Sequence, residues 1–121
     1  MTRKEIADSF LKLASSGRVQ DAYARHIHPQ FRHHNPYFKG DRQSLLKGME
    51  ENAKQFPGKT YKTLRVVEEG DLVAIHGRVA LAPDSHWSVI HIFRFEGDLI
   101  IEEWEASQDV PDESPNENGI F

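Results

Sequence analysis

Three short turn segments divide the second half of the chain, and they restrict the fold more than any other feature of the sequence. They are Glu69-Gly70-Asp71, Pro83-Asp84-Ser85 and Glu96-Gly97-Asp98. The segments between them are rich in β-branched and aromatic residues, and each is long enough for one strand. We therefore predict four strands, joined by tight hairpins into an antiparallel sheet, over residues 60–68, 72–82, 86–95 and 99–108.

The first half of the chain has helical periodicity instead. Apolar residues recur every three or four positions over residues 3–15 and 19–28, and again from Asp41 to the stop at Pro57-Gly58. Residues 28–40 contain two prolines and a glycine, so we expect an ordered loop there with one short extended stretch. Three helices followed by four or more strands indicate one α+β domain over residues 1–121, with residues 109–121 as an irregular tail.

Composition excludes several classes of protein. The chain has no cysteine, and therefore no disulfide, no cysteine nucleophile and no thiolate metal site. It has no apolar run of the roughly 20 residues that cross a bilayer, and no concentrated basic face of the kind that binds nucleic acid. We therefore expect neither a membrane nor a nucleic acid as partner. The N-terminus lacks the apolar stretch of a secretory signal, so the cytoplasm is the expected location.

Two features bear on self-association. The sheet face turned away from the helices is predicted to be apolar, which favours a homodimer packed sheet to sheet; its predicted members are Leu72, Ala74, Ile90, Ile92, Ile100 and Trp104. Residues 95–121 hold nine acids and no base, whereas all 15 lysines and arginines lie in residues 1–94. We expect the acidic end to be solvated, and the alternative is that it neutralises a basic face on a partner subunit.

The candidates for acid/base chemistry lie on the last two predicted strands. Side chains alternate between the two faces of a strand, so Glu103 and Glu105 share one face. If the hairpin loop has three residues with Gly97 in the last position, His91 faces the same side as these two glutamates. A two-residue loop would instead place His91 with Glu102 and Trp104. No pattern typical of a zinc site is present.

The end of the chain resembles a known family. The segment Phe93-Arg94-Phe95-Glu96-Gly97-Asp98-Leu99-Ile100-Ile101-Glu102-Glu103-Trp104-Glu105 is similar to the F-R-x-x-x-G-x-I-x-E-H-W-D pattern of the SnoaL-like branch of the nuclear transport factor two-like superfamily. The loop His34-Asn35-Pro36 and the ending Asn116-Glu117-Asn118-Gly119-Ile120-Phe121 resemble a bacterial group of SnoaL-like aldol-condensation enzymes. The resemblance implies a cone-like fold of three helices over a curved antiparallel sheet with a central pocket.

The resemblance also implies a chemistry. In the polyketide cyclases of the family, an aspartate on the last strand is the acid/base group and a histidine on the preceding strand lies near it. These positions fall on Glu105 and His91 of this chain. Glu105 is one methylene longer than the family's aspartate, and Glu103 stands where the group often has a histidine.

We therefore expect an acid/base enzyme without a cofactor, acting on a small apolar carbonyl compound by aldol cyclisation, isomerisation or a related proton transfer. A Glu105 carboxylate in a pocket walled by Trp87, Phe93 and Ile101 would lose hydration, and its pKa would rise toward that of an effective general base. His91 would polarise the carbonyl group. His34 and Asn35, from the loop at the pocket mouth, would bind the oxyanion, and Glu103 would face the substrate.

Several alternatives stay open. Glu103 and Glu105 could be hydrated at a strand end, with Glu103 paired to Arg94 or Arg78, and His91 could be a buried histidine bonded to a carbonyl. His34, His91 and Glu105 could together bind a divalent ion, but we expect no metal. The alternative function is a non-catalytic dimer of the same fold that binds a small ligand or a protein.

Overall fold

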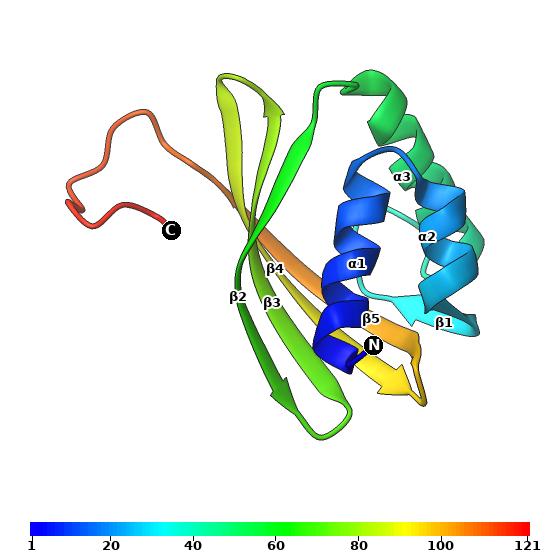
Figure 1. Cartoon of the computed structure of the whole chain (residues 1–121). Coiled ribbons are helices and arrows are strands. Elements are labelled where there is room, and N and C mark those ends of the chain that lie inside the picture. Colours follow the sequence, from blue (N-terminus) through cyan, green and yellow to red (C-terminus); the bar gives the residue numbers. More distant parts are fainter.

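The computed structural model describes residues 1–121 and has three helices on one side of a five-stranded sheet (Figure 1). The helices are α1 (Arg3–Ser15), α2 (Val19–His26) and α3 (Arg42–Gln55). The strands are β1 (Ile27–His33), β2 (Thr60–Glu69), β3 (Leu72–Ala82), β4 (Ser85–Glu96) and β5 (Leu99–Asp109). The predicted α+β class is confirmed, and β2 to β5 begin and end within one residue of the predicted positions.

Two helices begin at residues that satisfy their free backbone N–H groups. The Thr2 hydroxyl accepts a hydrogen bond from the Glu5 backbone, and the Glu5 carboxylate accepts one from the Thr2 backbone, so that α1 begins with a capping box. Asp41 caps α3 by accepting from the backbone N–H of Ser44 at 3.1 Å. Helix α2 ends at His26, two residues earlier than predicted, because the chain turns directly into β1.

Strand β1 makes the sheet mixed, whereas the sequence predicted an antiparallel sheet. The strand order is β1-β5-β4-β3-β2, and β1 pairs parallel with β5 at one edge. Residues 28–40 do contain the expected extended stretch. A full strand was not predicted there because of the proline and histidine content of the segment. Pro29 is compatible with β1 because an edge strand leaves one side of its backbone unpaired.

The hairpin between β4 and β5 differs from the predicted one in two compensating ways. Its loop has two residues, Gly97 and Asp98, and Gly97 adopts a positive φ of 60°. Strand β5 then contains one extra residue, Ile101, between the pair Arg94–Glu102 and the pair Phe95–Ile100. This bulge restores the alternation that the predicted three-residue loop would have produced. Beyond the bulge, His91 is opposite Glu105 and Phe93 is opposite Glu103.

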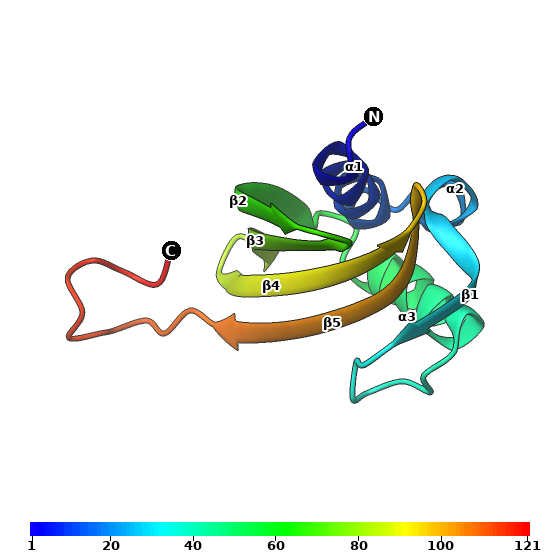
Figure 2. The ribbon, with the colours of Figure 1, turned by 90° about the horizontal axis from the view of Figure 1, so that it is seen from below.

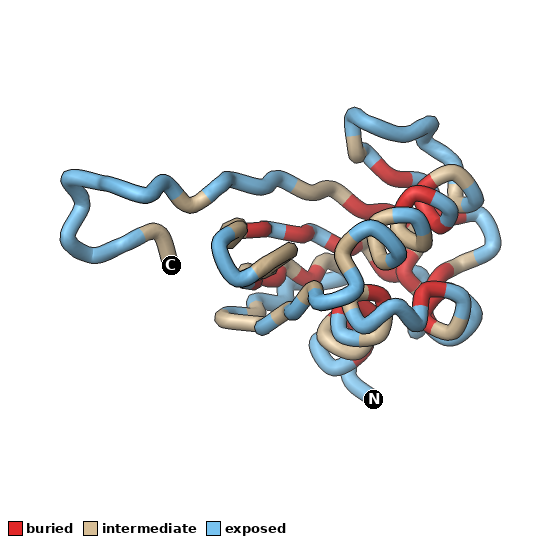
Figure 3. The backbone as a smooth tube through the Cα atoms, turned by 90° about the horizontal axis from the view of Figure 1, so that it is seen from above, coloured by how far each residue is buried: buried red, intermediate tan, exposed pale blue.

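The helices pack against the concave face of the sheet, which curves around them (Figure 2). Phe10 of α1 contacts Tyr23 of α2 and Phe93 of β4 edge to face, with ring centroids 5.7 and 5.8 Å apart. The buried segments lie where helices meet the sheet, and the segment after Asp109 is mostly exposed (Figure 3). None of the three helices has the length and apolarity needed to cross a membrane.

The convex face of the sheet is turned away from the helices. Val67, Ala74, Ile92 and Trp104 are paired in register across β2, β3, β4 and β5, and they form an apolar row on this face. Ile100 was predicted to belong to this face, but the bulge at Ile101 turns it into the core, where it is fully buried. The C-terminal Phe121 returns to the same face, where its carbonyl oxygen accepts a hydrogen bond from Arg65 at 3.1 Å.

Candidate functional site

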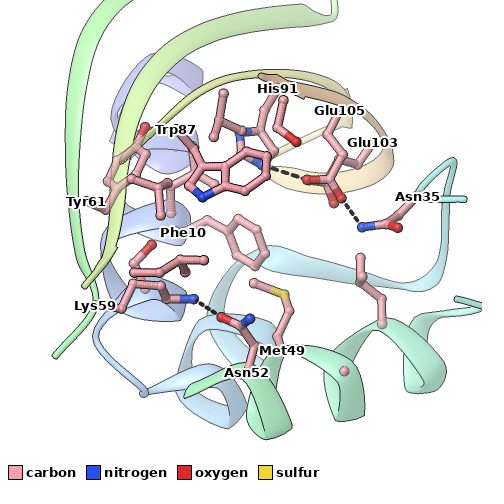
Figure 4. A pocket seen from close by; sticks show the side chains of 18 of the residues that line it. Phe10, Asn35, Met49, Asn52, Lys59, Tyr61, Trp87, His91, Glu103 and Glu105 are labelled. Carbon is pink, nitrogen blue, oxygen red and sulfur yellow. Dashed lines mark hydrogen bonds and ion pairs between the residues drawn. The ribbon is translucent and has the colours of Figure 1, made fainter. Parts of the chain in front are cut away.

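A cavity of about 320 Å³ lies between the helices and the concave face of the sheet. Its walls come from α1, α3, β2, β3, β4, β5 and the loop after β1 (Figure 4). Most of the wall is apolar, with Phe10, Leu11, Met49, Val79, Trp87 and Val89 among its residues. This volume is at the small end of the range for ligand pockets, roughly 300–1,000 Å³, so the cavity suits a small molecule.

One end of the cavity carries a cluster of three titratable side chains. The Nε2 atom of His91 lies 3.3 Å from Oε2 of Glu105 and 3.5 Å from Oε1 of Glu103. On the other side of Glu105, the Nδ2 atom of Asn35 donates a hydrogen bond to Oε1 at 2.5 Å. Figure 4 shows the Glu105 carboxylate between His91 and Asn35, facing the cavity.

Three separate elements bring this cluster together. The register of β4 and β5 places His91 directly opposite Glu105, and the alternation along β5 adds Glu103 to the same face. The ring of Phe93, the next inward residue on β4, stacks on the His91 ring with an interplanar angle of 8°. Asn35 follows β1, and its backbone N–H donates to Nδ1 of His33, which holds the loop against the sheet.

Burial and hydrogen bonding separate the pKa values of the two glutamates. The Glu103 side chain is only 5% exposed, and loss of hydration raises its pKa to about 8. Burial acts on Glu105 too, but the hydrogen bonds from His91 and Asn35 outweigh it and hold its pKa below the ordinary value. We predicted a raised pKa for Glu105, and that prediction is wrong; Glu103 is the carboxyl group whose pKa rises.

His91 is the cation of the cluster. Burial alone would lower its pKa, but the hydrogen bond to Glu105 and the nearby charges of both glutamates raise it above the ordinary value. Its Nδ1 atom is buried and has no hydrogen-bond partner, so Nε2 makes the polar contacts of the ring. The pKa shifts therefore favour an imidazolium, a Glu105 carboxylate and a protonated Glu103, a combination with no net charge.

The opposite end of the cavity holds a cation that sequence reasoning did not single out. Lys59 follows α3, and its Nζ atom donates to Oδ1 of Asn52 at 2.7 Å. Burial lowers the pKa of Lys59. Figure 4 shows this pair across the cavity from Glu105. In the sequence, a lysine directly after Pro57-Gly58 has no feature that distinguishes it from a solvent-exposed one.

Most, but not all, of the predicted site residues line the cavity. His91, Glu103, Glu105, Asn35 and Trp87 line the cavity. Phe93 is fully buried beneath His91. Ile101, which we expected in the wall, is the bulged residue of β5 and is not among the lining residues.

His34 lies on the other face of the sheet, which contradicts its predicted place at the pocket mouth. Its Nε2 atom is 2.8 Å from Oε2 of Glu102, and its ring stacks on Trp104 with centroids 5.1 Å apart. Successive residues of an extended chain point to opposite faces, so the inward position of His33 turns His34 outward. Glu102, rather than Glu103, binds Arg94, and the alternative in which Glu103 pairs with Arg94 or Arg78 is not observed.

A divalent cation is the group that the cluster could hold. One ligand atom from each of His91, Glu103 and Glu105 lies within 4.8 Å of the others. Binding would require a neutral His91 and a deprotonated Glu103, because protons and metals compete for the same atoms. The pKa shifts favour the opposite protonation of both residues, so the cluster is better suited to holding protons. His34 lies on the opposite face of the sheet and therefore cannot bind the same metal ion as His91 and Glu105.

Comparisons with known proteins agree on the fold. The structure is similar to IdmH from Streptomyces antibioticus, a candidate polyketide cyclase, with a TM-score of 0.75, 18% sequence identity and coverage of 89% of this chain and 93% of that chain. It is also similar to AclR from Streptomyces galilaeus, a candidate hydroxylase, with a TM-score of 0.75, 19% identity and 88% of each chain covered.

An uncharacterised cystatin-fold protein from Novosphingobium aromaticivorans has a TM-score of 0.76, 16% identity and coverage of 88% of this chain and 98% of that chain. Identities this low establish the fold alone. No curated protein matches the sequence. The model of the SnoaL-like domain matches residues 7–103, which include most of the helical layer and most of the cavity wall but end before Glu105. The chain therefore belongs to the family of SnoaL-like domains.

Proposed function

We propose that the protein is an acid/base enzyme that moves a proton on a small, mostly apolar carbonyl compound. The observation that carries the proposal is the pair of His91 and Glu105, 3.3 Å apart, at one end of a mostly apolar cavity. A carboxylate beside an imidazole ring that donates from Nε2 supplies a proton acceptor and a hydrogen-bond donor to the same substrate. The SnoaL-like fold and the similarity to a candidate polyketide cyclase support this class of reaction.

In the proposed reaction, Glu105 removes a proton from the carbon next to the substrate carbonyl. The electron pair of the broken C–H bond moves into the carbonyl group and forms an enolate. His91 stabilises the enolate oxygen, because Nε2–H is freed from Glu105 once that carboxylate has taken the proton. Return of the proton to another carbon completes an isomerisation. In an aldol cyclisation, the enolate carbon instead attacks a second carbonyl carbon of the same molecule, and the alkoxide that forms takes back the proton held by Glu105.

Asn35 and Glu103 have supporting roles in this proposal. Asn35 fixes the orientation of the Glu105 carboxylate by its hydrogen bond to Oε1. Glu103 stays protonated near neutral pH, so it adds a polar wall beside His91 without a second negative charge. His34, which we expected to bind the oxyanion, has no part because it lies on the convex face.

Proton exchange at carbon tests the proposal directly. Exchange of the α-protons of 2-tetralone for deuterium would be followed by NMR, with wild type and Glu105→Gln compared. We expect the wild-type enzyme to accelerate the exchange and Glu105→Gln to reduce that acceleration about 100-fold or more. Glu113→Gln, in the exposed tail, is the matched control and should leave the rate unchanged. Equal rates for wild type and Glu105→Gln would rule out Glu105 as the base.

The second candidate function is a non-catalytic module that binds a small ligand. The observation in its favour is that Glu105 already accepts hydrogen bonds from two donors, which makes its carboxylate a weaker base. A binding module would take up 2-tetralone without accelerating its exchange. Binding with no wild-type exchange would therefore decide for this candidate.

We also propose that the protein forms a homodimer through the convex face of the sheet. The apolar row there is incompletely covered by the chain itself: Val67 is 65% exposed and Ile92 is 37% exposed. Neighbouring Ile90 is 47% exposed. Apolar surface of this kind is usually covered in solution, and a second copy of the same face is self-complementary under two-fold symmetry.

A further inference from the structure

We infer that the substrate carries one negative charge, most simply a carboxylate, which is bound by Lys59 at the end of the cavity opposite Glu105. This inference rests on the proposed function, since it names the class of carbonyl compound that the same cavity would take. The apolar body of the ligand would then lie along Phe10, Met49 and Trp87, with its reacting carbon at Glu105.

The first support is that Lys59 has no counter-charge. It takes part in none of the ion pairs of the structure. Its side-chain hydrogen bond goes to a neutral group, the Oδ1 atom of Asn52. An ammonium group removed from water without an acid nearby is costly, and buried charges are usually paired. A ligand carboxylate beside Nζ would supply the missing partner.

The second support is the charge balance of the cavity. Four of its lining side chains are titratable in the neutral range or charged: Lys59, His91, Glu103 and Glu105. His91 and Glu105 are 3.3 Å apart, and their pKa shifts favour an ion pair whose two charges offset each other. Glu103, with a pKa of about 8, adds no charge at neutral pH. With this ion pair formed, the net charge of the cavity is that of Lys59, and a monoanion would neutralise it.

The third support is the position of Lys59 at an opening. It lines the main cavity and also a second, mostly polar hollow formed by Lys12, Ser15, Ser16, Thr60 and Tyr61. An anionic end group bound there would keep some contact with water, while the rest of the ligand would lie in the apolar part of the cavity. This arrangement also orients the ligand, because only one end of the cavity holds an unpaired cation.

The test compares two probes of nearly the same shape, cinnamate and cinnamamide, of which only cinnamate carries a charge. Dissociation constants would be measured at pH 7 by NMR titration of labelled protein. We expect cinnamate to bind wild type about 10-fold more tightly than cinnamamide, as a charge-assisted hydrogen bond predicts. In Lys59→Met, cinnamate binding should weaken to the level of cinnamamide, whose own affinity stays unchanged. Lys59→Arg should retain the preference because it keeps the charge.

Lys12→Met is the matched control, because Lys12 lies near the same opening but is 60% exposed and paired with Asp8. It should bind both probes as wild type does. Equal affinity of wild type for the two probes, or an undiminished preference in Lys59→Met, would overturn the inference. A second readout is the NMR signal of Lys59 Nζ: tens of millimolar cinnamate should raise the pKa of Lys59, and an unmoved signal would also overturn the inference.

These results are separable from the test of catalysis. Probe binding does not require proton transfer, so Glu105→Gln should still prefer cinnamate. If 2-tetralone exchanges at Glu105 but wild type does not prefer the acid, the charge assignment fails and the reaction stands. If the acid is preferred and 2-tetralone binds without exchange, the anion site stands and the reaction fails.

Discussion

Glu103 and Glu105 lie two residues apart on the same face of β5, yet their pKa values move in opposite directions. Glu105 accepts hydrogen bonds from His91 and Asn35 and stays ionised at lower pH than an ordinary glutamate. Glu103 has no such donors, and burial raises its pKa to about 8. The pair thus behaves as one carboxylate and one carboxylic acid at neutral pH, a division that suits acid/base chemistry.

Glu103→Gln should change how stability depends on pH. The folded protein keeps a proton on Glu103 up to a pKa of about 8, whereas the unfolded chain loses it near 4.5. The unfolded state therefore binds fewer protons between these values, and wild-type stability falls as pH rises through that range. We expect Glu103→Gln to match wild type at pH 5 and to become more stable than wild type toward pH 9, by up to about 1.4 kcal/mol per pH unit.

Urea unfolding at pH 5, 7 and 9 would measure this difference. Glu113→Gln, in the exposed tail, serves as the control and should track wild type at every pH. A difference between Glu103→Gln and wild type that stays constant with pH would contradict a raised pKa for Glu103.

Asn35→Ala should raise the pKa of Glu105. The variant removes a donor that stabilises the ionised carboxylate, and the remaining burial acts in the opposite direction. Titration of the side-chain carboxyl carbon by NMR would report the shift. Asn116→Ala is a matched control, because Asn116 in the tail accepts from the backbone two residues on, as Asn35 does, but lies far from the site. The prediction fails if the two variants leave Glu105 with the same pKa.

Glu102→Gln should remove an acid-sensitive part of the stability. Glu102 accepts hydrogen bonds from Arg32, His34 and Arg94, which lower its pKa to about 2. A lowered folded-state pKa contributes stability that is present above about 4.5 and is lost as pH falls toward about 2. We expect Glu102→Gln to be less stable than wild type at pH 7, with the difference shrinking in urea unfolding at pH 4 and 2.5. A gap that widens in acid would be the contrary result.

Ile92→Lys should dissociate the proposed homodimer. The substitution places a charge in the middle of the apolar row on the convex face, opposite Trp104. We expect light scattering at micromolar concentration to give twice the chain mass for wild type and one chain mass for Ile92→Lys. Gln43→Lys, an equally charged change on the exposed side of α3, should leave the mass of wild type unaltered. A single-chain mass for wild type would refute the dimer.

The hairpin strands and the composition of the polar cluster could be predicted from the sequence because both depend on local patterns. Turn residues fix where β2 to β5 end, and alternation fixes which residues share a face. The face of His91 relative to Glu105 was predicted with the wrong loop length, and the extra residue Ile101 in β5 compensates for the shorter loop.

What could not be predicted depends on contacts distant in sequence. The parallel pairing of β1 with β5 decides that His33 points inward and His34 outward, and no local pattern specifies it. The relative pKa values of Glu103 and Glu105 depend on Asn35, which is 70 residues from Glu105. Lys59 lines the cavity from the segment between α3 and β2 and bonds Asn52 of α3, and its sequence neighbours give no sign of its burial.

The bulge at Ile101 has a consequence for how this site can change over evolution. Deleting Ile101 would only close the bulge, because the pairs on either side of it would stay as they are. Loss of the bulge with the sequence unchanged would instead shift β5 by one residue, so that Glu102 and Trp104 would face the cavity in place of Glu103 and Glu105. Such a slip would replace a carboxyl pair by a glutamate and an indole without any substitution in the cavity wall. Changes that add or remove a bulge in this hairpin therefore offer related domains a short route to new chemistry.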